Sequence, residues 1–118
     1  MRFSQKQFRH YQKNHSQFST TNQRPYSKMR LTASEVPRFV IQNLDNVNYN
    51  AKARQHPDVV RKMIQRYFHR IDQNHVQVSA SFLAAVTAVP NPHYDTGIRH
   101  LNGRIQDNDP ENLKWIPE

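Results

Sequence analysis

The spacing of apolar residues predicts one strongly amphipathic helix over about residues 57–72. Its apolar side chains recur every three to four positions, which places them on one face of a helix. Pro57 suits the first helical position, because the backbone N–H that it lacks has no partner inside a helix. The apolar positions are Val59, Val60, Met63, Ile64, Tyr67, Phe68 and Ile71, and the opposite face carries Arg61, Lys62, Arg66 and Arg70. Two interpretations of that basic face stay open, a solvated surface or a contact with phosphate.

Two shorter helices are predicted on either side of this one. The first follows a capping-box spacing, Thr32 to Glu35, and covers about residues 33–44. The second covers about residues 79–89 and comes after a short alternating segment, 76–78, that we interpret as a strand. Together with a hairpin near the C-terminus, these elements predict an α+β fold, a small helical domain followed by a β-hairpin module.

Charge is distributed unevenly along the chain, which has 17 Lys and Arg residues, nine Asp and Glu residues and a formal charge of +8. Residues 1–34 hold seven of the cations and no acid, and they lack an aliphatic period that could bury a helix face. We therefore predict an extended basic arm over 1–34 and a compact domain over 35–118. Cations neutralise phosphates and aromatic rings stack on bases, so this aromatic-containing arm indicates nucleic-acid binding. A solubilising tail is the alternative.

Composition excludes several other classes of protein. The chain has no cysteine, which rules out disulfides, thiol catalysis and cysteine-based zinc sites. No apolar run approaches the roughly 20 residues of a membrane span, so we expect no membrane partner. The first residues are polar and basic, without the apolar core of a secretory signal, and we expect a cytoplasmic protein. A mitochondrial transit peptide is the open alternative, because residues 1–34 are basic, contain serine and hold no acid.

The segment 97–116 carries the most specific motif in the chain. It reads His-Leu-Asn-Gly at 100–103, followed by Asn-Asp-Pro-Glu-Asn-Leu-Lys-Trp at 108–115. Asn-Gly favours a tight turn with positive φ, so we predict that 98–100 and 104–106 pair as short strands.

This motif resembles the HNH endonuclease family, especially its phage and homing-endonuclease members. The resemblance extends upstream to the helix at 79–89 and to the Pro-Asn-Pro turn at 90–92. It implies a ββα-metal fold in which His100 is the general base and Asn112 braces the loop that holds His100. In the family a divalent metal binds the scissile phosphate. Histidine suits a general base, because its ordinary pKa lies near neutrality.

The chain departs from the family pattern at the expected metal ligands. Arg99 stands where the family usually has Asp or Asn, and a cation does not replace an oxygen ligand of Mg²⁺. The helix with the second ligand would follow Trp115, and we expect it to be missing because the sequence ends at Glu118. We therefore expect no metal or other cofactor, and Mg²⁺ only if the protein is an active nuclease. Arg99 would instead meet phosphate where a metal once stood.

These observations favour a non-catalytic nucleic-acid-binding protein on a degenerate HNH fold. An arm that threads structured RNA explains the charge asymmetry better than a helix in a DNA groove, so we favour RNA, with a ribosome-associated factor as the concrete form. The first alternative is an active nicking endonuclease of phage type on duplex DNA. The second is a protein-interaction module or inhibitor.

The candidate nucleic-acid contacts follow from these arguments. Phosphate contacts are predicted at Arg2, Lys6, Arg9, Lys13, Arg24, Lys28, Arg30, Arg61, Lys62, Arg66, Arg70, Arg99 and Arg104. Stacking on bases is predicted at Phe3, Phe8, Tyr11, Phe18 and Tyr26.

Overall fold

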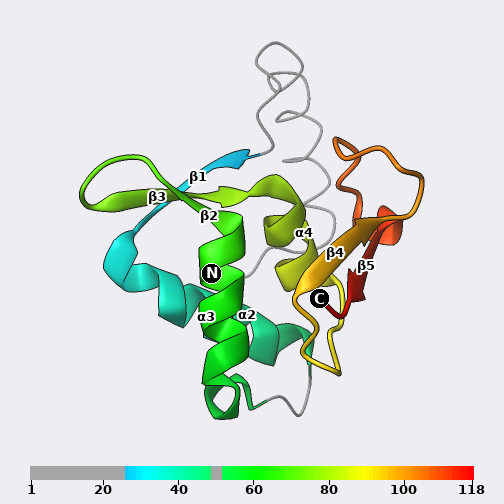
Figure 1. Cartoon of the computed structure of the whole chain (residues 1–118), viewed down its shortest axis with the longest axis horizontal. Coiled ribbons are helices and arrows are strands. Elements are labelled where there is room, and N and C mark those ends of the chain that lie inside the picture. Colours follow the sequence, from blue (N-terminus) through cyan, green and yellow to red (C-terminus); the bar gives the residue numbers. More distant parts are fainter. Residues whose placement is uncertain (1–25, 49–51) are drawn as a thin grey trace.

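Three helices and two small antiparallel sheets make up residues 26–48 and 52–118, the residues that the computed structural model describes (Figure 1). This is the predicted α+β class. The elements are β1 (Tyr26–Thr32), α2 (Val36–Val47), α3 (Pro57–Tyr67), β2 (Phe68–Arg70), β3 (His75–Ser79), α4 (Ala80–Ala88), β4 (Gly97–His100) and β5 (Leu113–Ile116). Short 3-10 turns cover Ala33–Glu35, Ala53–Gln55 and Pro110–Asn112. Within these ranges, no helix is long and apolar enough to cross a membrane.

The helix α4 forms the centre of the core. It lies between the three-stranded sheet and the β4–β5 hairpin, and its residues 82–87 are all buried (Figure 1). The ring of Phe82 is fully buried and meets three other rings, those of Tyr67, Phe68 and Trp115, with centroids 4.8, 5.6 and 6.1 Å away. One side chain therefore joins α3, the sheet and the hairpin.

The β4–β5 hairpin is docked on α4 through its inner face. Leu113 and Trp115 are buried there, and the indole Nε1 of Trp115 donates a hydrogen bond to the carbonyl of Val89 at 3.0 Å. Tyr67 adds a link from α3, because its hydroxyl donates to the carbonyl of Thr96, just before β4, at 2.5 Å. These contacts hold the hairpin rigidly on the domain.

The folded domain begins earlier than the sequence analysis predicts. Residues 26–32 form β1, which pairs with β3 in the sheet order β1-β3-β2, so this stretch is not part of an arm. Its side chains alternate, with Ser27 buried and Lys28 and Arg30 exposed. The charge count concealed this period of two, which is the signal of a half-buried strand.

The helix predicted over 57–72 ends at Tyr67, and the chain continues directly into β2. Phe68 and Ile71 fit a helical spacing, but pairing of β2 with β3 replaces the last helical turn. Asp72 closes the turn between these strands, since its Oδ1 accepts the backbone N–H of Asn74 and of His75, each at 2.8 Å. These hydrogen bonds hold the pKa of Asp72 below its ordinary value.

The predicted pairing of 98–100 with 104–106 is wrong. Strand β4 pairs instead with β5, in the register Ile98 to Trp115 and His100 to Leu113. The burial of Leu113 and Trp115 favours this partner, because 104–106 has only one apolar side chain to offer. Gly103 does have the predicted positive φ, of 76°, but its turn lies inside a loop over 101–112.

Other elements agree with the sequence analysis. The predicted strand at 76–78 lies within β3, and the helix predicted over 79–89 is α4. The helix predicted over 33–44 is a 3-10 turn followed by α2. As expected for the capping box, the carboxylate of Glu35 accepts the backbone N–H of Thr32 at 2.9 Å.

Candidate nucleic-acid interface

The two faces of the β4–β5 hairpin differ in character. The inner face carries Ile98 and His100 opposite Trp115 and Leu113. Arg99 points to the outer face, which is exposed, because successive side chains of a strand alternate. Strand pairing puts Lys114 directly opposite Arg99 on this outer face.

Arg99 and Lys114, which we call the hairpin cation pair, are two like charges placed side by side. Side chains directly opposite in an antiparallel pair have Cβ atoms about 4.5–5.5 Å apart, and like charges there destabilise the sheet. Neither side chain makes a hydrogen bond or ion pair with any other residue that the structure describes. The hairpin therefore presents two uncompensated positive charges to solvent.

His100 lies on the inner face, opposite to Arg99. Its Nε2 donates a hydrogen bond to Oδ1 of Asn108 at 2.7 Å, and Asn108 is buried. Strand alternation therefore places Arg99 and His100 on opposite faces of β4. Since Nε2 carries the hydrogen in this bond, the free lone pair of the neutral ring is on Nδ1.

Asn112 forms the clamp of the 101–112 loop. Its Oδ1 accepts the backbone N–H of Asn102 at 2.9 Å. Its Nδ2 donates to the carbonyl of Asp107 at 2.8 Å and to Oδ1 of Asn102 at 3.0 Å. The side-chain amide thus joins both arms of the loop, as its chemistry allows. The loop backbone is held independently of anything that binds to it.

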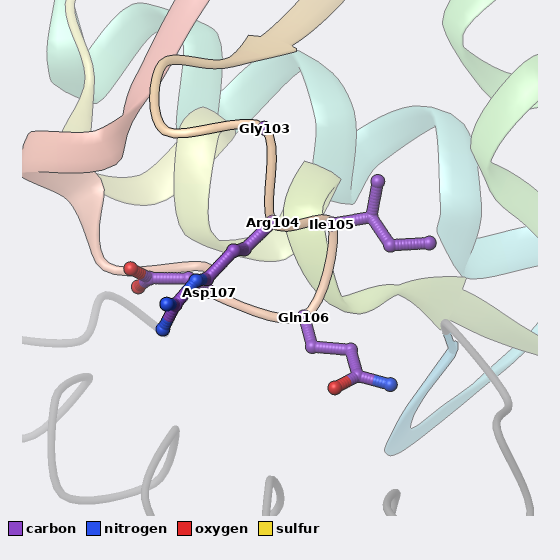
Figure 2. A pocket seen from close by; sticks show the side chains of 5 residues that line it. All are labelled: Gly103, Arg104, Ile105, Gln106 and Asp107. Carbon is purple, nitrogen blue, oxygen red and sulfur yellow. The ribbon is translucent and has the colours of Figure 1, made fainter.

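The loop ends in an exposed tip, Arg104–Gln106, beside an open hollow of about 490 Å³ (Figure 2). The hollow is also lined by Gly103 and Asp107. Figure 2 shows the three tip side chains fanning out from the loop. Arg104, one of the predicted phosphate contacts, thus lies at a part of the loop that solvent reaches.

The basic face of α3 is partly occupied. Lys62 and Arg66 both contact Glu118, through its backbone oxygen and its carboxylate respectively. Hydrogen bonding to Glu118 raises the pKa of Arg66 above its ordinary value. Arg61 makes an exposed ion pair with Asp58, its neighbour one helical turn earlier, at 3.0 Å. Neither a solvated surface nor a phosphate contact, the two interpretations of this face, anticipates the contacts of Lys62 and Arg66 with Glu118.

Glu118 joins α3 to the hairpin. Its backbone oxygen accepts a hydrogen bond from the hydroxyl of Thr96 at 3.1 Å. A Cβ placed on Gly97 would come within 2.9 Å of the Glu118 side chain and of Ile116, so only glycine allows this close approach. The carboxylate of Glu118 therefore lies at the start of β4, between the cations of α3 and the hairpin.

The remaining predicted contacts fall in two groups. In the folded domain, Lys28 and Arg30 are exposed on β1, the ring of Tyr26 packs on that of His69 at 5.2 Å, and Arg70 donates to the carbonyl of Gln73. The others lie outside the described residues: Arg2, Lys6, Arg9, Lys13, Arg24, Phe3, Phe8, Tyr11 and Phe18.

A metal centre has no obvious ligands in the described part of the chain. Across 26–48 and 52–118, no three His, Asp or Glu side chains gather as a metal site would require. Asp107 is engaged inside the loop, where its Oδ2 accepts Nδ2 of Asn102 at 2.7 Å. Within the described residues, no hydrogen bond joins Asp107 to His100.

Sequence reasoning missed two residues of this region. Lys114 becomes notable only through its register opposite Arg99, which the incorrect pairing with 104–106 concealed. Asn108 becomes notable only as the partner of His100. Its one sequence signal is its place in the quoted motif, eight positions after the histidine.

Comparison with known proteins adds no relative to this picture. No family model, curated protein or solved structure matches the chain. The likeness of residues 97–116 to the HNH motif therefore stands on the residues alone.

Proposed function

We propose that this protein is a non-catalytic nucleic-acid-binding protein whose folded domain contacts phosphates through the outer face of the β4–β5 hairpin. The hairpin cation pair is the observation that carries this proposal. Arg99 and Lys114 repel each other in the free protein, and a bound phosphate would relieve that repulsion. A polyanion is the ligand that such a pair fits best, in agreement with the formal charge of +8.

Structured RNA is the favoured ligand. The five cations that precede β1, with no acid among residues 1–25, suit an arm that follows an irregular phosphate backbone, and a ribosome-associated factor is the concrete form of this proposal. The rigid hairpin would then supply a fixed contact while the arm supplies reach. Duplex DNA remains the ligand expected if the HNH likeness also extends to function.

The residue before His100 supports binding rather than cleavage. The HNH family usually has an oxygen ligand for the metal at this position, whereas Arg99 supplies a cation that suits a phosphate. The proposed protein uses the HNH-like loop as a scaffold for phosphate contacts.

The test is a salt series of binding measurements on the full chain. Fluorescence anisotropy would follow a labelled RNA hairpin and a duplex DNA of equal length, with Arg99→Ala, Lys114→Ala and the double variant. Each phosphate contact adds about 0.7–0.9 to the slope of log K against log salt, so each single variant should lower the slope by about that amount. Lys52→Ala, an exposed lysine outside the hairpin, is the matched control and should leave the slope unchanged.

Three results would contradict the proposal in different ways. A double variant with the wild-type slope would show that the hairpin does not contact phosphate. Tighter binding of the duplex DNA would overturn the choice of RNA. Magnesium-dependent nicking of plasmid that His100→Ala abolishes would establish the nuclease instead.

A further inference from the structure

The tip of the 101–112 loop combines three side-chain chemistries at one exposed place. Ile105 is 70% exposed, the most exposed large hydrophobic residue of the described domain. Arg104 supplies a positive charge and Gln106 an amide with both donors and an acceptor. Among the described residues, neither the Arg104 guanidinium nor the Gln106 amide has a partner.

An exposed isoleucine on a mobile loop would not indicate a binding site, but hydrogen bonds within this loop fix its conformation. Asn112 and Asn102 join its two arms, as described above, and the backbone N–H of Asp107 donates to the carbonyl of Arg104 at 3.1 Å. The tip is thus a tight turn on a clamped base. A side chain held in solvent by such a frame is pre-organised for contact, because little conformational freedom remains to be lost on binding.

Two of the three acids of the loop, Asp107 and Asp109, are engaged in hydrogen bonds within the loop. Asp107 accepts from Asn102 through Oδ2 and from the backbone of Asp109 through Oδ1. Asp109 accepts the backbone N–H of Glu111 at 3.0 Å. These hydrogen bonds fix both carboxylates within the loop, and Arg104 is the charged residue of the tip 104–106.

The hollow beside the tip has the size and chemistry for a flat, partly polar group. Its volume of about 490 Å³ lies within the range of small-molecule sites, roughly 300–1,000 Å³. An unpaired nucleobase has two apolar faces and a polar edge, and proteins recognise it by stacking and by hydrogen bonds to that edge. Ile105 can cover one face, while the amide of Gln106 can pair with the edge.

We infer that the Arg104–Gln106 tip holds one unpaired nucleobase of the bound nucleic acid, with Ile105 against its face, Gln106 at its edge and Arg104 on the adjoining phosphate. This inference rests on the proposed function. It adds that the preferred target contains a bulged or looped-out base near a paired stem, with the hairpin cation pair contacting the stem.

The test compares two RNA hairpins that differ by one bulged adenine. Ile105→Ala should weaken binding of the full chain to the bulged hairpin by about three- to tenfold and leave the fully paired hairpin unchanged. Gln106→Ala should reduce the preference for a bulged adenine over a bulged uracil. Ile71→Ala is the matched control, an exposed isoleucine at the far end of the molecule between β2 and β3, and should affect neither probe (Figure 1).

A second readout reports the base itself. With 2-aminopurine at the bulge, binding of the wild-type protein should change the fluorescence of the base, and Ile105→Ala should remove that change. The inference would be overturned if Ile105→Ala weakened the binding of both RNA hairpins equally. It would also be overturned if the Ile105→Ala protein changed the 2-aminopurine fluorescence as much as the wild type does. Circular dichroism would establish that each variant is folded.

The outcomes separate this inference from the proposed function. One outcome is that the double variant Arg99→Ala, Lys114→Ala binds both RNA hairpins more weakly while Ile105→Ala binds both as tightly as the wild type. In that case the tip contact is wrong and the phosphate contact stands. If only Ile105→Ala has an effect, and only on the bulged hairpin, the tip contact stands without the hairpin cation pair. Failure of the wild-type protein to bind either hairpin would overturn both and direct attention to a protein partner.

Discussion

The buried side chain of Tyr67 makes the stability of the domain depend on pH in alkaline solution. Its ring lies against Phe82, and its hydroxyl donates to the carbonyl of Thr96. Burial raises the pKa of Tyr67 from 10.0 to about 12, because the phenolate would lose its hydration there.

This shift gives a prediction for alkaline solution. Below pH 10 the phenol is protonated in the folded and unfolded chain alike, so Tyr67 adds no pH dependence. Between pH 10 and about 12 only the unfolded chain releases the proton, so the free energy of unfolding should fall, on the order of 2 kcal/mol in total. Absorbance at 295 nm should show one tyrosine ionising later than the others, and Tyr67→Phe should remove that late step. A single step near pH 10 for all five tyrosines would contradict the assignment.

At the scale of the element, the like-charged pair on the β4–β5 hairpin lowers the stability of the hairpin. An opposite-charge pair at directly facing positions stabilises a sheet by roughly 0.2–1 kcal/mol, whereas the like-charged pair of Arg99 and Lys114 destabilises it. The hairpin as it stands is therefore less stable than its backbone allows.

Lys114→Glu should accordingly stabilise the fold and weaken the binding of nucleic acid. We expect the free energy of unfolding to rise by about 0.2–1 kcal/mol, measured in urea at low salt, because the new carboxylate faces Arg99. Affinity for the RNA hairpin should fall together with the salt slope. Lys52→Glu, which makes the same charge change on an exposed residue outside the hairpin, should give no gain in stability. A destabilised Lys114→Glu protein would count against an electrostatic cost in the native hairpin.

The elements also show what the sequence could and could not provide. The stripe of α3 was predicted because its burial follows from local spacing, and the bracing role of Asn112 was implied by the resemblance to the HNH motif. The strand β1 and the partner of β4 were missed. Both depend on pairing between distant segments, and local spacing does not choose between Arg104–Gln106 and Leu113–Ile116. The hairpin cation pair was invisible for the same reason.

For the whole molecule, Glu118 lowers the positive electrostatic potential on one side of the domain. It contacts Lys62 and Arg66 of α3 and lies across the start of β4 at Gly97. Its carboxylate therefore reduces the positive potential between α3 and the hairpin cation pair.

Removing this carboxylate should strengthen the binding of nucleic acid. Glu118→Gln should raise affinity for the RNA hairpin several-fold at low salt and increase the salt slope, because Arg66 becomes available to phosphate. Stability should change by less than about 1 kcal/mol, since the ion pair is exposed. The charge-matched control is Glu35→Gln in the 3-10 turn that follows β1, where glutamine preserves the capping box. If both variants strengthen binding equally, net charge rather than the position of Glu118 is responsible.

Trp115 gives the molecule a built-in optical reporter. It is the single tryptophan of the chain, and its indole is held between the ring of Phe82 and the carbonyl of Val89, where the hairpin meets α4. Tryptophan fluorescence, selected by excitation at wavelengths that tyrosine does not absorb, therefore reports on this junction. Separation of the hairpin from α4 would expose the indole to water and shift its emission to longer wavelength, even if the helices remained folded. The contact between the hairpin and α4, on which the proposed phosphate-binding surface depends, can thus be followed in the unlabelled protein, in dilute solution and in real time.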